Sequence, residues 1–464
     1  MNIIFFIFIT IFLQIVCLYV AKQSSKSLDS QEDYFLAGKK LKFFPLAMTF
    51  VATQIGGGLI LGSAEEAYRV GWIAILCPIG CVVGLLLLGV GLGKRLAQMQ
   101  VSTIAQIFEV AYDSANLKRV ASLLSIISLF MILIAQIIAS NKFMLSLGVD
   151  NKLLFFAFWG IVIFYTSLGG LKAVVATDIV QAFFFIAVFV ICIGYIFFTS
   201  DISLAQTFSN QILTTQKDVT TSQLYGWLLM PLLFMLIEQD MAQRCFSALN
   251  DKIVSKATLS AGLVILLVAS FPVYLGVLAN QMGLEITGNT SILMTVIQKT
   301  STPFLTALMG AAILVAIIST ADSLLNAISS NISQDFVFIK QRPVSFSQKL
   351  TLLIALLAIF FSFYFDRILD LLLVSYELSV SCLFIPIFIS LFKTKGNKQS
   401  AWLAVIFGGL GFALFRLILT DLPRELLSVL LSLTGFVIGE LWVVMTVAKI
   451  EEKDYVAKEQ MSLP

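Results

Sequence analysis

The chain alternates between long apolar runs and short segments that carry most of its charged residues. A helix needs about 20 apolar residues to cross about 30 Å of hydrocarbon, and the runs predict thirteen such helices. Their expected bounds are 3–20, 43–67, 72–93, 119–146, 152–168, 174–199, 223–246, 254–282, 303–328, 349–365, 369–392, 400–420 and 425–448. The pattern therefore predicts an all-α polytopic membrane protein.

The composition agrees with this prediction and excludes several classes of function. Of 464 residues, 59% are hydrophobic and 12% are charged, and there is no histidine. Histidine-based acid–base catalysis, metal ligation and proton relay are therefore excluded. The longest connectors, around 21–42, 94–118 and 200–222, are too short to fold as a soluble domain, so we do not expect an enzyme. Six scattered cysteines, with Cys77 and Cys81 one turn apart, are expected to pack in the core.

The distribution of basic residues orients the chain. The first apolar run lacks a basic segment before it, so we expect a retained helix and not a cleaved signal peptide. Alternate loops then collect roughly three times as many lysines and arginines on one side as on the other. This bias predicts an outside N-terminus and a cytoplasmic C-terminus. The net charge of +3 reflects this topology and predicts no nucleic-acid partner.

A run of three glycines interrupts an apolar segment, in Phe50-Val-Ala-Thr-Gln-Ile-Gly-Gly-Gly-Leu-Ile-Leu-Gly62. Irregular backbone at membrane depth is tolerated where it lines a wet cavity or is buried in protein. A break at Gly56, Gly57 and Gly58 would free the carbonyls of Ala52 and Ile55 as ligands for a cation. Alternatively, the glycines allow close packing between helices.

A second polar cluster lies in the segment 316–330. On a helix, Ser319, Asp322 and Ser323 share one face, and the Ala316 carbonyl lies beside the Thr320 hydroxyl. Two freed carbonyls, the Ala316 carbonyl and the hydroxyls of Ser319 and Thr320 would supply five oxygens for a sodium ion. Serine and threonine also serve as interhelical glue, but an aspartate at membrane depth indicates a functional site.

A third feature joins two expected helices near the cytoplasmic face, in Ser167-Leu-Gly-Gly-Leu-Lys-Ala-Val-Val-Ala-Thr-Asp-Ile-Val-Gln181. Asp178 and Gln181 lie one turn apart as the next helix begins. Asp178 either complements the helix dipole or stands on an inward release path for a cation.

Together these stretches resemble the sodium:solute symporter family, which includes sodium/glucose, sodium/proline and choline transporters. The family pattern Gly-Gly-x-x-Ala-Val-x-x-Thr-Asp-x-x-Gln matches from Gly169 to Gln181. Thr-Gln-Ile-Gly-Gly-Gly, the following Gly-Ser-Ala-Glu-Glu-Ala-Tyr68 and Ser-Thr-Ala-Asp-Ser323 are most similar to the high-affinity choline transporters and their bacterial relatives.

The resemblance implies a LeuT-type core of two inverted five-helix repeats, with one helix before it and two after. The core's first and sixth helices, 43–67 and 223–246, would both be broken around a midplane substrate site, with Pro231 as the breaker of the second. The implied parts are an N-terminal helix and connector at 1–42, the repeats at 43–199 and 200–395, two C-terminal helices at 396–448 and a tail at 449–464.

Carried over to this sequence, the family's sodium site consists of the backbone oxygens of Ala52, Ile55 and Ala316 and the side chains of Ser319 and Thr320. The resemblance also implies a second sodium site or release path at Asp178, Asp322 and Ser323.

The substrate site departs from the choline pattern. A quaternary ammonium needs an aromatic cage, but the matching positions hold Gln54 and Glu238. We therefore expect Gln54, Gln136, Glu238 and Gln239 to form a hydrogen-bonding pocket for a small polar solute. Glu238 could instead pair with Arg244. Glu377 is either a gate or a structural partner for a cation.

The resulting expectation is sodium-coupled symport of a small polar organic solute by alternating access, with Na+ as the coupling ion. No organic cofactor or protein partner is expected, and the expected location is the cell membrane, in bacteria the inner membrane. Two alternatives are a proton-coupled carrier that uses Asp322 or Asp178, and a solute-sensing transceptor. For the transceptor, only 448–464 would remain as an output segment.

Overall fold

A computed structural model of the chain describes residues 2–28, 30–148, 150–199, 219–284, 291–336, 343–365, 368–393, 395–418 and 423–461. Most of the expected connector at 200–222 lies outside these residues.

The described elements are helices, with one isolated bridge between Leu41 and Ala248. The principal helices are α1 (Ile3–Ser24), α2 (Gln31–Leu36), α3 (Phe43–Gln54), η3 (Gly58–Gly62), α4 (Ser63–Val70), η4 (Gly71–Ile75), α5 (Leu76–Leu87), η5 (Leu88–Leu92), α6 (Gly93–Gln98), α7 (Gln106–Tyr112), α8 (Ala115–Ser146), α9 (Lys152–Thr199), α11 (Thr221–Met235), α12 (Gln239–Ser247), α13 (Asp251–Gln281), α14 (Ile292–Thr300), α15 (Pro303–Asp335), α16 (Val344–Ser362), α17 (Ile368–Ser390), α18 (Lys398–Leu417) and α19 (Arg424–Met461).

Within the described residues, ten helices are long and apolar enough to cross a membrane. This confirms the predicted all-α polytopic class, while the count of thirteen stays a prediction. Helix α9 covers two of the predicted spans, which meet at a kink where the backbone of Gly170 leaves helical geometry. Gly170 has a φ of 54°, and a Cβ there would lie 2.3 Å from the carbonyl oxygen of Tyr34. Only glycine fits this bend.

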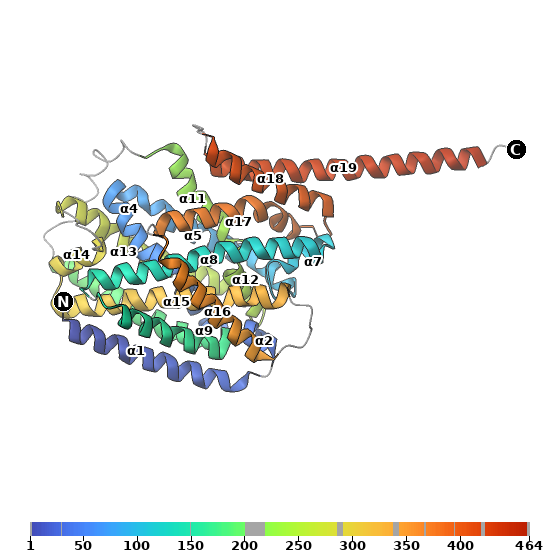
Figure 1. Ribbon diagram of the computed structural model, residues 1–464. Coiled ribbons are helices and arrows are strands. Elements are labelled where there is room, and N and C mark those ends of the chain that lie inside the picture. Colours follow the sequence, from blue (N-terminus) through green and yellow to red (C-terminus); the bar gives the residue numbers. More distant parts are fainter. Residues whose placement is uncertain are drawn as a thin grey trace.

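Helix α15 lies at the centre of the bundle and packs against α8 and α9 (Figure 1). Most of its side chains are buried, including the hydroxyls of Ser319 and Thr320. Apolar side chains on the outer helices, such as Phe8, Phe198 and Trp442, are largely exposed, as expected for a surface that faces lipid. The end of α19 extends away from the other helices (Figure 1).

The helices that follow Phe43 and Thr221 are also interrupted within the bundle. Helix α3 ends at Gln54, and Ile55 has φ −86° and ψ 80°, outside the helical region. Helical backbone resumes at Gly57 and continues as one π-helical turn from Gly58 to Gly62.

The second interruption separates α11 from α12. Glu238 is extended, with φ −67° and ψ 129°, and the N–H groups of Ile237 and Glu238 both bond to the Phe234 carbonyl. The prediction that Pro231 breaks this helix was wrong, because Pro231 lies inside α11. Its missing N–H is tolerated there, and the tightened turn after Phe234 is what ends the helix.

Candidate functional site

The end of α3 leaves backbone oxygens without their usual helical donors. The N–H of Gly56 bonds to the Gln54 carbonyl at 3.1 Å, so it is turned away from the Ala52 carbonyl. The N–H of Gly57 bonds instead to Oε1 of Gln136 at 2.7 Å. The carbonyls of Ala52 and Thr53 are therefore available to other partners.

Hydroxyl groups of α15 meet these carbonyls. Ser319 Oγ lies 2.8 Å from the Ala52 oxygen and 2.8 Å from the Ala316 oxygen. Thr320 Oγ1 donates to the Thr53 oxygen at 2.9 Å and lies 3.4 Å from the Ala316 oxygen. Four of the five residues expected at the sodium site thus converge through their oxygens. The fifth, Ile55, is buried at the break itself.

The donor set suits an alkali cation. The oxygens named above are neutral carbonyls and hydroxyls, and carbonyls at the C-terminal end of a broken membrane helix are typical sodium ligands in proteins. Gly56 is needed for the close approach of α3 to α15, because a Cβ there would lie 2.4 Å from Thr320 Oγ1. The glycines therefore serve both the break and the close packing.

A buried arginine lies next to these oxygens. Arg244 of α12 is completely buried, and its Nη2 donates to Ser323 Oγ at 2.6 Å and to Asp178 Oδ2 at 3.4 Å. Its Nε donates to Thr49 Oγ1 at 3.0 Å, and Thr49 in turn donates to Asp178 at 2.5 Å. Asp178 and Ser323 are therefore bridged by a guanidinium group.

Asp322 makes hydrogen bonds with other residues. Its carboxylate accepts hydrogen bonds from Tyr165 at 2.9 Å and from Thr166, both on α9. The hydrogen-bond partners of Asp322 therefore differ from those of Asp178 and Ser323.

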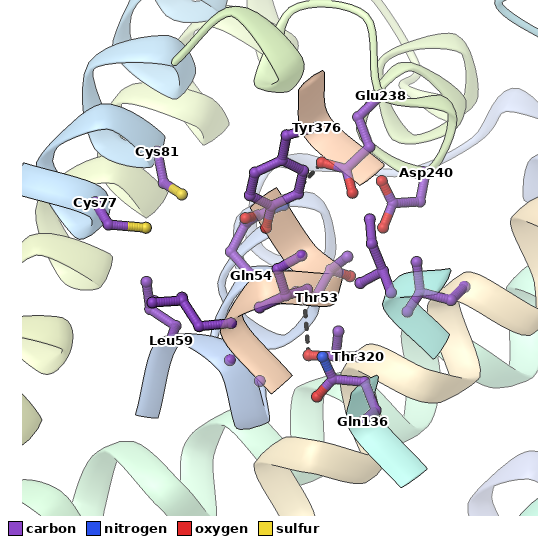
Figure 2. Close-up of a pocket in the computed structure, with 16 residues that line it drawn as sticks. Thr53, Gln54, Leu59, Cys77, Cys81, Gln136, Glu238, Asp240, Thr320 and Tyr376 are labelled. Carbon is purple, nitrogen blue, oxygen red and sulfur yellow. Dashed lines mark hydrogen bonds between the residues drawn. The ribbon is translucent and has the colours of Figure 1, made fainter. Parts of the chain in front are cut away.

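A small pocket with a cavity volume of about 40 Å³, part of it open to solvent, adjoins the broken end of α3 (Figure 2). It is lined by three of the four expected substrate residues, Gln54, Gln136 and Glu238, and Gln54 Nε2 donates to Glu238 at 3.4 Å. Thr53, Gly56 and Thr320 line the same pocket. The pocket and the set of candidate sodium ligands thus share Thr320.

Gln239 is not among the lining residues. Its side chain is buried, accepts a hydrogen bond from the Ile104 N–H at 2.6 Å and lies 3.5 Å from the Ser102 carbonyl. It points away because it is the first residue of α12, and its neighbour Glu238 faces the pocket.

Sequence reasoning missed several lining residues, among them Asp240, Tyr376, Cys77 and Cys81. Asp240 follows Glu238 by two positions, and a second acidic residue at membrane depth was the available signal. Cys77 and Cys81 were expected to pack in the core, and the structure shows that both also line the pocket.

Glu377, next to Tyr376, faces away from the pocket. It accepts hydrogen bonds from Arg416 at 2.6 and 3.1 Å. Of the two roles considered for Glu377, the structure supports that of a structural partner for a cation, the Arg416 guanidinium.

Comparisons with known proteins agree with this geometry. The family model for the sodium:solute symporter family matches residues 34–408. High-affinity choline transporter 1 of Caenorhabditis elegans is 28% identical over 194 residues, which is 39% of this chain and 33% of that protein. The chain therefore matches only about a third of that relative. The sodium/pantothenate symporter of Haemophilus influenzae is 26% identical over 365 residues, covering 72% of this chain and 73% of that protein.

Two solved structures share the fold. A Na+-coupled sialic acid symporter in a substrate-bound outward-open state gives a TM-score of 0.79 at 17% identity, covering 94% of this chain and 97% of that one. A nucleobase-cation-symport-1 family transporter in a closed conformation gives 0.63 at 14% identity, covering 89% and 94%. The fold is thus of the LeuT type. With the family model matching most of its length, this chain belongs to the sodium:solute symporter family.

Proposed function

We propose that this protein is a sodium-coupled secondary active symporter that imports a small polar organic solute by alternating access. The observation that carries the proposal is the convergence of oxygens from the broken end of α3 and from α15. Ala52, Ile55, Ala316, Ser319 and Thr320 are the proposed sodium ligands. The names of the relatives, a sodium/pantothenate symporter and a Na+-coupled sialic acid symporter, support sodium coupling.

The geometry suggests how sodium and substrate are linked. Sodium bound between α3 and α15 would hold these helices together and so fix the wall of the adjoining pocket, because Thr320 and the end of α3 belong to both. Opening toward the cytoplasm would separate α3 from α15 and release sodium. Movement of one charge across about 100 mV supplies about 2.3 kcal/mol, to which the sodium gradient adds.

The remaining roles belong to the same proposal. Gln54, Gln136 and Glu238 contact the solute, and Gln239 supports the start of α12. Sodium leaves past Asp178, with Asp322 and Ser323 as further candidate ligands on that path. The repeats comprise 43–199 and 200–395, and the chain lies in the cell membrane with its N-terminus outside.

A proton-coupled carrier is the second candidate. It is favoured by Asp322, whose buried carboxylate is paired with the neutral donors Tyr165 and Thr166. Buried carboxylates paired only with neutral donors are candidates for a reversible proton site.

The test is uptake by proteoliposomes of purified protein, screened against a panel of labelled metabolites. An inward sodium gradient should drive accumulation, and an equal potassium gradient should not. Accumulation that persists without sodium at acid pH would reject sodium coupling in favour of the proton-coupled carrier.

A further inference from the structure

Two carboxyl groups face the pocket, and none of its sixteen described lining residues is basic. Glu238 is 6% exposed and Asp240 is 1% exposed. Their side chains lie next to each other beside the ring of Tyr376 (Figure 2). When two buried carboxylates are neighbours, their negative charge has to be compensated by a proton or a cation.

The protein supplies little of that compensation. Arg244 donates to the backbone oxygen of Asp240 at 2.9 Å, but its charge is paired with Asp178. The N-terminus of α12 carries about half a positive charge, which is less than two carboxylates need. Oδ1 of Asp240 has no hydrogen-bond partner among the described residues. A buried acceptor of this kind is a docking point for a donor from a ligand.

We propose that the transported solute carries a protonated primary or secondary amine, which binds between Glu238 and Asp240. This inference rests on the proposed transport function and names the chemical class of its substrate. An ammonium group brings one positive charge and two or three N–H donors. Glu238 and Asp240 Oδ1 accept them, and the ring of Tyr376 beside these carboxyl groups (Figure 2) offers its face for a cation–π contact.

The same residues discriminate against other solutes. An anion would meet two acidic side chains and, among the described lining residues, no basic group. A quaternary ammonium has no N–H donor and would leave Asp240 Oδ1 unpaired, at a cost that a single tyrosine ring offsets only in part. The rest of the wall contains Gln54, Leu59, Cys77 and Cys81, which suits a short chain with a polar end.

The experiment measures the melting temperature of the purified full-length protein in sodium buffer with matched small solutes. The amines are methylamine, ethanolamine and 1,3-diaminopropane. The counterparts of ethanolamine are ethylene glycol and glycolate, and choline represents quaternary ammonium compounds. Because a ligand stabilises the folded state by mass action, the protonated amines should raise the melting temperature. The neutral, anionic and quaternary compounds should raise it much less.

Two variants locate the effect. Glu238→Gln and Asp240→Asn should each raise the amine concentration at half-saturation about 10- to 100-fold, because this factor corresponds to the usual contribution of a hydrogen bond to a charged group. Asp335→Asn is the matched control, because Asp335 is a buried carboxylate that bonds to Thr103 and Ser122 and does not line the pocket. It should leave amine binding unchanged.

The outcomes separate this inference from the proposed function. Sodium alone should stabilise wild type and both pocket variants relative to potassium, since neither carboxylate is a proposed sodium ligand. Stabilisation by sodium without any response to amines, or an equal response to neutral or anionic counterparts, would overturn the amine inference alone. Loss of the sodium response in Glu238→Gln or Asp240→Asn would also overturn it, because the pair would then bind sodium. No sodium response in wild type would count against the proposed function.

A second measurement needs no variant. The thiolates of Cys77 and Cys81 attack 2-aminoethyl or 2-sulfonatoethyl methanethiosulfonate, forming a mixed disulfide and releasing methanesulfinate. Each labelling rate is divided by the rate at which the same reagent reacts with a free thiol in solution. By this measure the cationic reagent should label the two cysteines faster than the anionic reagent does. Ethanolamine should slow labelling by the cationic reagent. Equal relative rates, read by peptide mass spectrometry, would contradict a cation-selective pocket.

Discussion

Arg244 and Asp178 form an ion pair in which Nη2 lies 3.4 Å from Oδ2 and neither side chain is exposed. The same Nη2 donates to Ser323, whose hydroxyl contacts both the Ser319 carbonyl and Thr53. The pair therefore ties α9, α12 and α15 together one helical turn from the proposed sodium ligands. Any inward opening at this point has to break or move it.

Replacement of Arg244 by Gln should be strongly destabilising. It leaves Asp178 as an unpaired buried charge, which costs about 3–5 kcal/mol. Thermal unfolding in detergent measures the loss. Arg244→Gln combined with Asp178→Asn removes both charges and should recover part of it, whereas a double variant as unstable as the sum of the single changes would contradict the pairing. Arg69→Gln, at the exposed pair with Glu66, should have a much smaller effect.

Gly56→Ala should weaken sodium binding. Its Cβ would lie 2.4 Å from Thr320 Oγ1 and 2.9 Å from Gln136 Oε1, so the hydroxyl has to leave its present position. The apparent sodium affinity, measured by sodium-dependent stabilisation, should fall at least about tenfold, equivalent to about 1.4 kcal/mol. The control is Gly62→Ala, since the nearest atom to a Cβ there is 3.6 Å away. If both variants bind sodium like wild type, α3 does not approach α15 as described.

Gln136→Leu should loosen the break in α3. It removes the acceptor of the Gly57 N–H, a bond of 2.7 Å, and an unpaired buried donor costs about 1–3 kcal/mol. Stability and apparent sodium affinity should fall together. Gln98→Leu serves as the comparison, because Gln98 makes an exposed bond to Asp251 and should change neither. A stable Gln136→Leu protein with altered substrate selectivity alone would assign Gln136 to the substrate only.

The sequence anticipated the features that depend on local chemistry. Three glycines in an apolar run indicated where α3 is interrupted, and α3 ends at Gln54, just before them. The period of α15 placed Ser319 and Thr320 within reach of carbonyls. These conclusions need only helix geometry and the cost of polar groups in a membrane.

Features that depend on the rotation of one helix relative to another could not be predicted in this way. Glu238 and Asp240 are two positions apart, and a regular helix would place them on nearly opposite faces. Only the extended backbone at Glu238 determines that Glu238 and Asp240 face the pocket while Arg244 reaches Asp178. Tyr376 likewise enters the pocket because α17 turns Glu377 toward Arg416.

The central claim is that oxygens from the end of α3 and from α15 bind sodium. A sodium titration of the melting temperature, in wild type and in a Ser319→Ala/Thr320→Ala variant at constant ionic strength, tests it most directly. The claim predicts a saturable rise in wild type that sodium produces and potassium does not, with half-saturation shifted to much higher sodium in the variant. An identical titration curve for the two proteins would contradict it.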